Sequence, residues 1–229
     1  DLLLGGAGDD LLLGGPGRDA AVFAGSGAGF ALIRGPAGWT VAGPDGTDSL
    51  SGVERAVFAD GARALAAPRE TDFGGRGFAD LLWRDAASGQ LYRWALQGAA
   101  RVEEGGIRPA GAGWTFGASA DLDGDACADL VWVGPGGAIY AWLMAGGAVR
   151  AEGALGALAP GERLAGLGDT DGDGASDLVL AAGGSWRVQR LLGTTPLSQA
   201  PGETLPPGWE IAALGDLDGD TRSDLLLLA

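Results

Sequence analysis

The sequence predicts an all-β protein, and three observations lead to this class. Glycine supplies 45 of the 229 residues without a collagen period, which indicates many tight turns between short strands. Short apolar runs such as DLLWR, DLVWV and DLLLL are typical of buried strands. A nine-residue acidic motif returns about every 48 residues, and a fixed period of this size marks a repeat architecture. We therefore expect a series of small β units.

The composition limits the functions that are expected. The formal net charge is −15, lysine and histidine are absent, and the arginines are scattered. We expect no nucleic-acid partner, because phosphate binding needs clustered basic residues. Without histidine the commonest general base is missing, and the single cysteine, Cys127, has no base to activate it, so we expect no enzyme. No apolar stretch is long enough to span a membrane.

The first section, residues 1–67, opens with a glycine-rich pattern of nine residues. The pattern G-G-x-G-x-D-x-U-x, where U is apolar, occurs twice after the tail of an earlier copy and places Asp1, Asp10 and Asp19 in register. Its glycines allow positive φ, so carbonyls can turn toward a cation while the aspartates add negative charge. The apolar residues Leu12 and Ala21 should face a thin core, and the repeats should end near Phe23.

These nonapeptides resemble the RTX family, whose repeats form a calcium-filled parallel β-roll and which is exported by type I secretion. The resemblance implies calcium ligation by repeat carboxylates and carbonyls. The residues concerned are Asp1, Gly5, Ala7, Asp10, Gly14, Pro16 and Asp19. The remainder of the section alternates apolar and polar residues around turns, which predicts a small β-sheet that caps the roll and prevents edge pairing.

The second section, residues 68–229, is organised around acidic loops. The loop DLDGDACAD begins at Asp121, and its copies DTDGDGASD and DLDGDTRSD begin at Asp169 and Asp216. Each copy has carboxylates at positions 1, 3, 5 and 9, and oxygen ligands of this kind suit Ca²⁺. An EF-hand does not fit, because its twelfth position needs a glutamate and Trp132 stands there. Four carboxylates would repel one another without a cation, so metal binding and local folding should be coupled.

Four strands in each period is the size of a propeller blade. The repeats resemble FG-GAP and VCBS repeats, which form integrin-like β-propellers with calcium in the loop between two strands of a blade. The resemblance implies side-chain ligands at four positions and a carbonyl ligand at position 7. The implied residues are Asp121, Asp123, Asp125, Cys127 and Asp129; Asp169, Asp171, Asp173, Ala175 and Asp177; and Asp216, Asp218, Asp220, Arg222 and Asp224.

A decayed copy of the loop, DFGGRGFAD, begins at Asp72. Gly74 and Arg76 replace the ligands at positions 3 and 5, so we expect no metal in this copy. We expect the Arg76 guanidinium to bridge Asp72 and Asp80 in place of the ion.

The tryptophans repeat in register. Equivalent places are held by Trp83 and Trp132, by Trp94 and Trp142, and by Trp114 and Trp209. Repetition in register favours packing, whereas several exposed rings around a shared cleft would favour stacking on sugars.

The number of blades does not predict an ordinary closed ring. Three full units are followed only by SDLLLLA. Either this strand pairs with the segment 62–70 to close a small ring, or another segment or subunit completes the propeller, which would leave strand edges exposed.

These patterns predict a secreted or cell-surface, calcium-binding structural or adhesive protein. The RTX resemblance implies that low cytosolic Ca²⁺ keeps the chain unfolded for export and that external Ca²⁺ then folds it. The alternatives are a carbohydrate-binding, lectin-like propeller and a non-catalytic accessory region of a secreted hydrolase. The expected partners are Ca²⁺, a cell-surface glycan or protein, and other copies or subunits.

Overall fold

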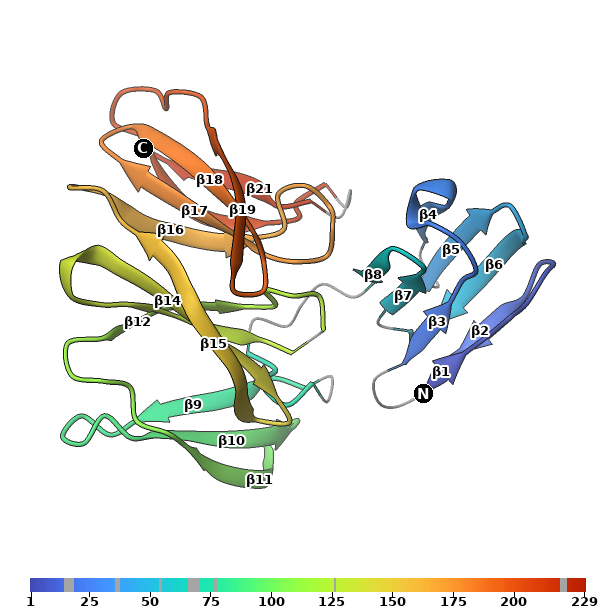
Figure 1. Ribbon diagram of the computed structural model, residues 1–229, viewed down its shortest axis with the longest axis horizontal. Helices are drawn as coiled ribbons and strands as arrows, with labels where there is room; N and C mark the ends of the chain where they lie inside the picture. The colour runs from blue at the N-terminus through green and yellow to red at the C-terminus, as the bar shows by residue number, and fades with distance from the viewer. Residues whose placement is uncertain are drawn as a thin grey trace. The chain divides into compact units, whose positions relative to one another are not determined.

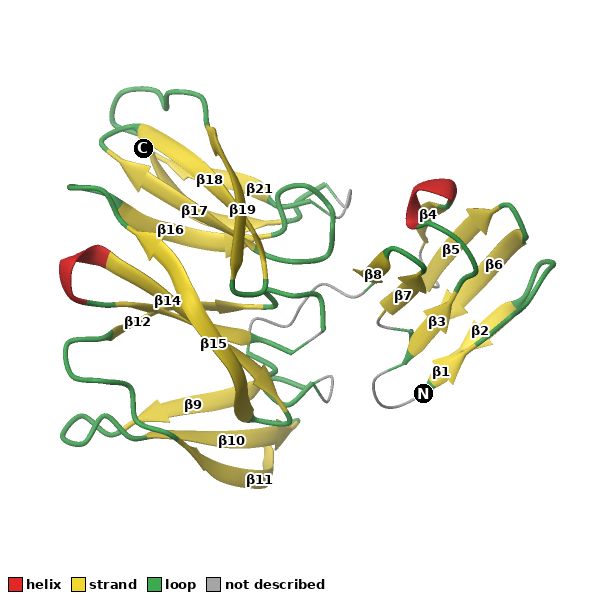
Figure 2. Ribbon diagram, viewed as in Figure 1, coloured by secondary structure: helices red, strands yellow, loops and turns green. Residues whose placement is uncertain are grey.

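The computed structural model describes residues 1–14, 19–35, 38–53, 55–65, 71–75, 78–125, 127–218 and 222–229. In these residues the chain forms β-strands and two short 3-10 turns, η1 (Gly27–Gly29) and η2 (Pro135–Gly137), which confirms the all-β class (Figure 2). The chain divides into two compact units, Asp1–Ala67 and Pro68–Ala229.

The first unit contains two four-stranded sheets (Figure 1). The strands of one sheet, in spatial order, are β1 (Leu2–Leu3), β3 (Ala20–Val22), β7 (Arg55–Phe58) and β8 (Gly61–Ala64). Those of the other are β2 (Leu11–Leu13), β6 (Gly46–Ser51), β5 (Gly38–Gly43) and β4 (Ala31–Gly35).

Successive nonapeptides alternate between these two sheets. β1 pairs in parallel with β3, so that Leu2 lies opposite Ala20 two repeats later, while β2 belongs to the other sheet. This is the predicted parallel roll. Leu12 and Ala21 are buried in one core with Phe58, as their place in the pattern predicts.

The cap continues the roll, which corrects the expectation that the roll ends near Phe23. β6 pairs in parallel with β2, with Leu50 opposite Leu12, and β7 pairs in parallel with β3, with Ala56 opposite Ala21. The antiparallel hairpin of β4 and β5 is inserted before this continuation. The insertion interrupts the nine-residue period, and this is why the sequence pattern appeared to stop.

The second unit consists of successive antiparallel sheets, which follow one another in chain order in Figure 1. The first sheet contains β9 (Asp80–Arg84), β10 (Leu91–Gln97) and β11 (Ala100–Ile107). The second contains β12 (Thr115–Ala120), β13 (Asp129–Val133), β14 (Ala138–Ala145) and β15 (Ala148–Ala157). The third contains β16 (Arg163–Gly168), β17 (Asp177–Ala182), β18 (Ser185–Leu192) and β19 (Thr195–Pro201), and the last contains β20 (Glu210–Gly215) and β21 (Asp224–Leu228).

Only the second and third sheets have the predicted four strands, and the sheets of the described residues do not close into a barrel. The C-terminal strand β21 pairs with β20, the strand that runs into the last acidic loop. The described part of segment 62–70 contributes to β8, which pairs with β7, and residues 66–70 lie outside the described residues. The small ring that would join β21 to this segment is therefore not seen.

The acidic loops of neighbouring sheets contact one another. The carbonyl of the first loop residue accepts a hydrogen bond from the next loop, as in Ala128 N–H to Asp72 (2.8 Å) and Ser176 N–H to Asp121 (2.7 Å). In the first two loops the second residue, Phe73 or Leu122, packs in the core shared with the next sheet. Leu122, for example, is fully buried in the cluster that also contains Leu178. Each loop is thus both a turn within one sheet and a contact with its neighbour.

Candidate metal centres

The loop that begins at Asp121 joins β12 to β13 and gathers carboxylates at a buried point. Ligand atoms of Asp121, Asp123 and Asp129 lie within 4.8 Å of one another, and Asp121 and Asp129 are fully buried. The N–H groups of Asp123 and Asp125 donate to Asp121 Oδ1 at 3.3 and 3.1 Å and so close the loop around it. Three of the four predicted carboxylates therefore converge, and the fourth, Asp125, is tied to the same centre through its backbone.

Asp129 fixes this centre to the sheet. Its Oδ2 accepts from Leu122 N–H at 2.9 Å, and its Oδ1 accepts from Met144 N–H of β14 at 2.7 Å. The ninth loop position thus links the loop to the next strand of the same sheet. In the third sheet Asp177 has the same place, accepting from Thr170 and from Leu191 N–H of β18 at 2.9 Å.

The other two loops also gather carboxylates. In the loop that begins at Asp169, ligand atoms of Asp169, Asp171 and Asp173 lie within 4.8 Å of one another. In the last loop the same holds for a second set, Asp216, Asp218 and Asp224. It is more exposed than the others, and Asp220 of this loop lies outside the described residues.

The position-7 residues contribute no charge of their own to these two inner loops. Cys127 and Ala175 are buried, and their N–H groups donate to Asp125 and Asp173 at 2.7 and 2.9 Å. Arg222 lies in the last loop, among the described residues. The carbonyl ligation of these three residues stays a prediction.

Burial and mutual repulsion affect the protonation of the carboxylates. Burial, helped by the charges of Asp121 and Asp125, raises the pKa of Asp129 to about 8, although N–H groups of Met144 and Leu122 oppose the shift. Burial likewise raises the pKa of Asp169, Asp173 and Asp177. A cation at these loops would favour the charged forms.

The pH dependence of the calcium-free protein follows from Asp129. Because its folded-state pKa lies above the usual 3.8, its contribution to stability is full below about pH 4 and is lost as pH rises toward about 8. We expect the free energy of unfolding in EDTA to fall across this window, by up to about 1.4 kcal/mol per pH unit for one such carboxyl. Urea unfolding between pH 5 and 7 measures the slope, because both limits lie about one pH unit inside this window. Asp129→Asn should reduce this slope, to which Asp169, Asp173 and Asp177 also contribute, and an equal slope in the variant would contradict the assignment.

Two arginines contact the outer carboxylates of the loops, which the sequence reading did not foresee. Arg150 of β15 contacts Asp123 and lies 3.5 Å from Asp125, and Arg190 of β18 lies 3.3 Å from Asp171. These guanidinium groups are partly exposed, so they offset some of the negative charge without filling the buried centre.

The decayed loop is contacted by a buried cation that the sequence reading did not assign. Arg76, the predicted bridge between Asp72 and Asp80, lies outside the described residues. Arg93 of β10 is buried, with Nη1 3.3 Å from Asp80 and Nη2 2.7 Å from Glu103. The sequence does contain an indication of this cation. Arginine stands in the apolar strand QLYRWALQG at the place where the equivalent strand of the second sheet, AIYAWLMAG, has alanine.

In the roll, Asp10 lies against an aspartate of the cap. Asp10 N–H donates to Asp48 Oδ1 at 2.9 Å, and burial together with the nearby charge of Asp10 raises the pKa of Asp48. Gly6 and Gly8 have φ of 95° and 115°, as the turn requires. Sequence reasoning missed Asp48, although GPDGTDSLS has glycine, aspartate and leucine at the spacing of a nonapeptide.

The remaining roll residues are placed as follows. Asp19 is buried and accepts from the Asp1 amino group at 2.8 Å, and Gly14 N–H donates to the Ser51 carbonyl at 3.0 Å. Gly5 and Ala7 lie in the turn before Asp10. Pro16 lies outside the described residues.

The packing role predicted for the tryptophans is confirmed for two equivalent pairs. Trp83 and Trp94 have ring centroids 5.0 Å apart, and Trp132 and Trp142 have the same separation. The pairs differ in environment, because Trp132 and Trp142 are buried whereas Trp83 is 48% exposed.

A series of antiparallel sheets with an acidic loop between the first two strands defines a blade-type repeat protein. Part of this series matches a known family: a model described as FG-GAP-like repeat covers residues 169–227, from the acidic loop that begins at Asp169 into β21. The FG-GAP part of the predicted resemblance is therefore confirmed for this span, and the RTX part stays a prediction. Comparison with curated proteins finds no match. The described residues contain no helix with the length and apolar character needed to cross a membrane.

Proposed function

We propose that this chain is a calcium-stabilised structural or adhesive module of an extracellular protein. The observation that carries the proposal is the convergence of three carboxylates at one point in each of three equivalent loops. FG-GAP-like repeats usually occur in extracellular proteins, where millimolar Ca²⁺ fills even weak sites.

The location of the loops explains how a cation would act on the whole unit. Each of the two inner loops, beginning at Asp121 and Asp169, accepts a backbone hydrogen bond from the following loop. An ion that orders one loop therefore also orders its contact with the next sheet. Because the calcium-free loops contain repelling carboxylates, the free energy of binding becomes folding free energy.

The ligands in this proposal are carboxylate oxygens from the acidic loops and oxygens from the roll. Hard oxygen donors in a flexible loop suit Ca²⁺ better than Mg²⁺, which needs near-ideal octahedral geometry. In the roll, the backbone N–H of Asp10 donates to the Asp48 carboxylate beside the pairing of β2 with β6, so the cap supplies a carboxylate that the nonapeptides alone would lack.

The role that we propose is non-catalytic. The chain has no histidine, and its clustered aspartates are assigned as ligands. Export in a calcium-poor, unfolded state and folding in external Ca²⁺ form part of the same proposal, because ordered loops would depend on the ion.

Calorimetric titration of Ca²⁺ into EDTA-treated, dialysed protein tests the proposal. We expect saturable binding of three or more ions and a rise in melting temperature, because each site stabilises the folded state by about 2.7 kcal/mol at a hundredfold excess of Ca²⁺ over Kd. Asp121→Asn should lose one site. Glu203→Gln, which removes the same charge at an exposed place outside the loops, should keep all sites. Absence of saturable binding, or a melting temperature indifferent to chelator, would overturn the proposal.

A further inference from the structure

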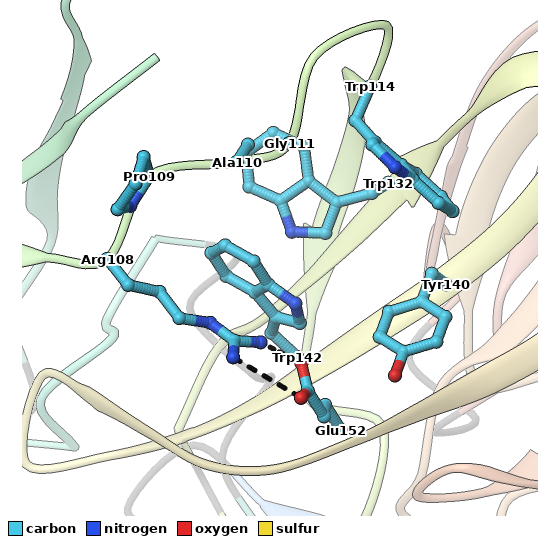
Figure 3. Close-up of a pocket in the computed structure, with 9 residues that line it drawn as sticks. All are labelled: Arg108, Pro109, Ala110, Gly111, Trp114, Trp132, Tyr140, Trp142 and Glu152. Carbon is cyan, nitrogen blue, oxygen red and sulfur yellow. Dashed lines mark hydrogen bonds and ion pairs between the residues drawn. The ribbon is translucent and has the colours of Figure 1, made fainter. Parts of the chain in front are cut away.

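The second unit contains a cavity of about 310 Å³ beside the connection from β11 to β12, as Figure 3 shows. A volume of this size is at the lower end of the range for small-molecule sites. The residues that line it are Arg108, Pro109, Ala110, Gly111, Trp114, Trp132, Tyr140, Trp142 and Glu152. All of them belong to this connection or to β13, β14 and β15.

Four aromatic rings surround this cavity (Figure 3). Trp132 and Trp142 are buried and form its inner part, with ring centroids 5.0 Å apart. Trp114 and Tyr140 are half-buried and pack edge to face at 5.7 Å. The cavity therefore offers apolar faces to a ligand and is open to solvent at its outer residues.

A charged pair lies at one side of the cavity. Arg108 and Glu152 form a two-point ion pair, one contact of which is Nη1 to Oε1 at 3.2 Å, and both side chains are partly exposed. The guanidinium carbon of Arg108 lies 4.3 Å from the ring centroid of Trp142. Donors and an acceptor are thus held beside an aromatic face, and the pair has no net charge.

The indole nitrogen of Trp132 is a further polar group at this site. Nε1 is buried and has no hydrogen-bond partner in the described part of the chain. A buried donor without an acceptor costs free energy, which a ligand oxygen would recover. The lining therefore combines aromatic faces, one buried donor and a paired cation and anion.

We propose that this cavity binds a neutral saccharide. The C–H face of a sugar ring would pack on the indoles, a ring or hydroxyl oxygen would accept from Trp132 Nε1, and hydroxyl groups would accept from Arg108 and donate to Glu152. An apolar occupant would desolvate the ion pair without replacing its hydrogen bonds, which is unfavourable. An anionic ligand would gain little from a pair whose charges already cancel. This inference goes beyond the proposed structural role and does not depend on calcium ligation.

The buried aromatic walls of the second sheet are not reproduced in the neighbouring sheets. The third sheet has Leu180 and Gln189 at the places of Trp132 and Trp142, as the strand pairings show. The first sheet keeps the equivalent pair, Trp83 and Trp94, but Trp83 is about half exposed, whereas Trp132 is buried. Substitutions can therefore separate the cavity from the general packing of the repeats.

Saturation-transfer difference NMR with methyl glycosides of glucose, galactose, mannose and N-acetylglucosamine tests the proposal, with the whole chain in saturating Ca²⁺. We expect saturable binding of at least one glycoside. Trp132→Phe keeps an aromatic ring but removes the N–H donor, and it should weaken binding about 3- to 10-fold. Trp114→Ala should weaken it further. Trp83→Phe, at an exposed ring outside the cavity, should leave the affinity unchanged.

Melting curves of each variant with Ca²⁺ and with EDTA accompany the NMR experiment. Folded protein that binds none of the glycosides at tens of mM, the order of a very weak single-sugar Kd, would overturn the saccharide proposal. So would binding of a proline-rich peptide in their place, since such peptides also dock on aromatic surfaces. A melting temperature that ignores EDTA would instead overturn the calcium proposal, so the two failures are distinguishable.

Discussion

Replacing Arg93 with methionine is expected to destabilise the second unit by about 3–5 kcal/mol, because it breaks a buried ion pair from one side. Arg93 and Asp80 are both buried, with Nη1 to Oδ2 at 3.3 Å. Methionine keeps much of the side-chain volume but removes the guanidinium beside the Asp80 carboxylate. Urea unfolding followed by tryptophan fluorescence measures the loss.

Two further variants make this result specific. Arg101→Met removes the same group from an exposed pair with Glu104 and should change stability by less than about 1 kcal/mol. Adding Asp80→Asn to the Arg93 variant should recover part of the loss, because the buried charge is then removed. Equal effects of the Arg93 and Arg101 substitutions would show that the buried pair has no special role.

Leu122→Ala is expected to cost about 2–5 kcal/mol, the range for truncating a buried leucine. Its side chain is fully buried in the cluster between the second and third sheets, together with Leu143 and Leu178. Because Leu122 is also the second residue of an acidic loop, the cavity left by the substitution weakens the contact between sheets at the candidate metal centre.

Leu217 provides a matched control at the same position of the last loop. It is 67% exposed, so Leu217→Ala should change stability by less than about 0.5 kcal/mol. Paired thermal and urea unfolding of the two variants measures the difference. Similar losses at Leu122 and Leu217 would mean that the second loop position does not act through packing against a following sheet.

The candidate centres were largely predictable because their ligands are local. Asp121 and Asp129 are eight places apart in one turn, and a turn closed by its own backbone N–H groups brings such residues together. The alternation of apolar residues in the nonapeptides was local in the same way, and Leu12 and Ala21 are buried as expected. Short-range spacing was sufficient in both cases.

Contacts between strands were not predictable in this way. Asp48 meets Asp10 only because β6 pairs in parallel with β2 after an inserted hairpin. Arg93 reaches Asp80 because β10 lies antiparallel to β9. Strand register decides these partners, and register depends on the turns and on core packing as well as on the residues themselves.

The sequence by itself determined the β class, the repeat period and the carboxylates of the acidic loops. Each of these depends on composition or on spacing within a few residues. Only the tertiary structure decided that Leu122 is buried while Leu217 is exposed, and that Trp132, Trp142 and Arg108 line one cavity. The reason is that equivalent residues of a repeat become different when their neighbouring sheets differ, because burial and partner choice arise from packing between sheets.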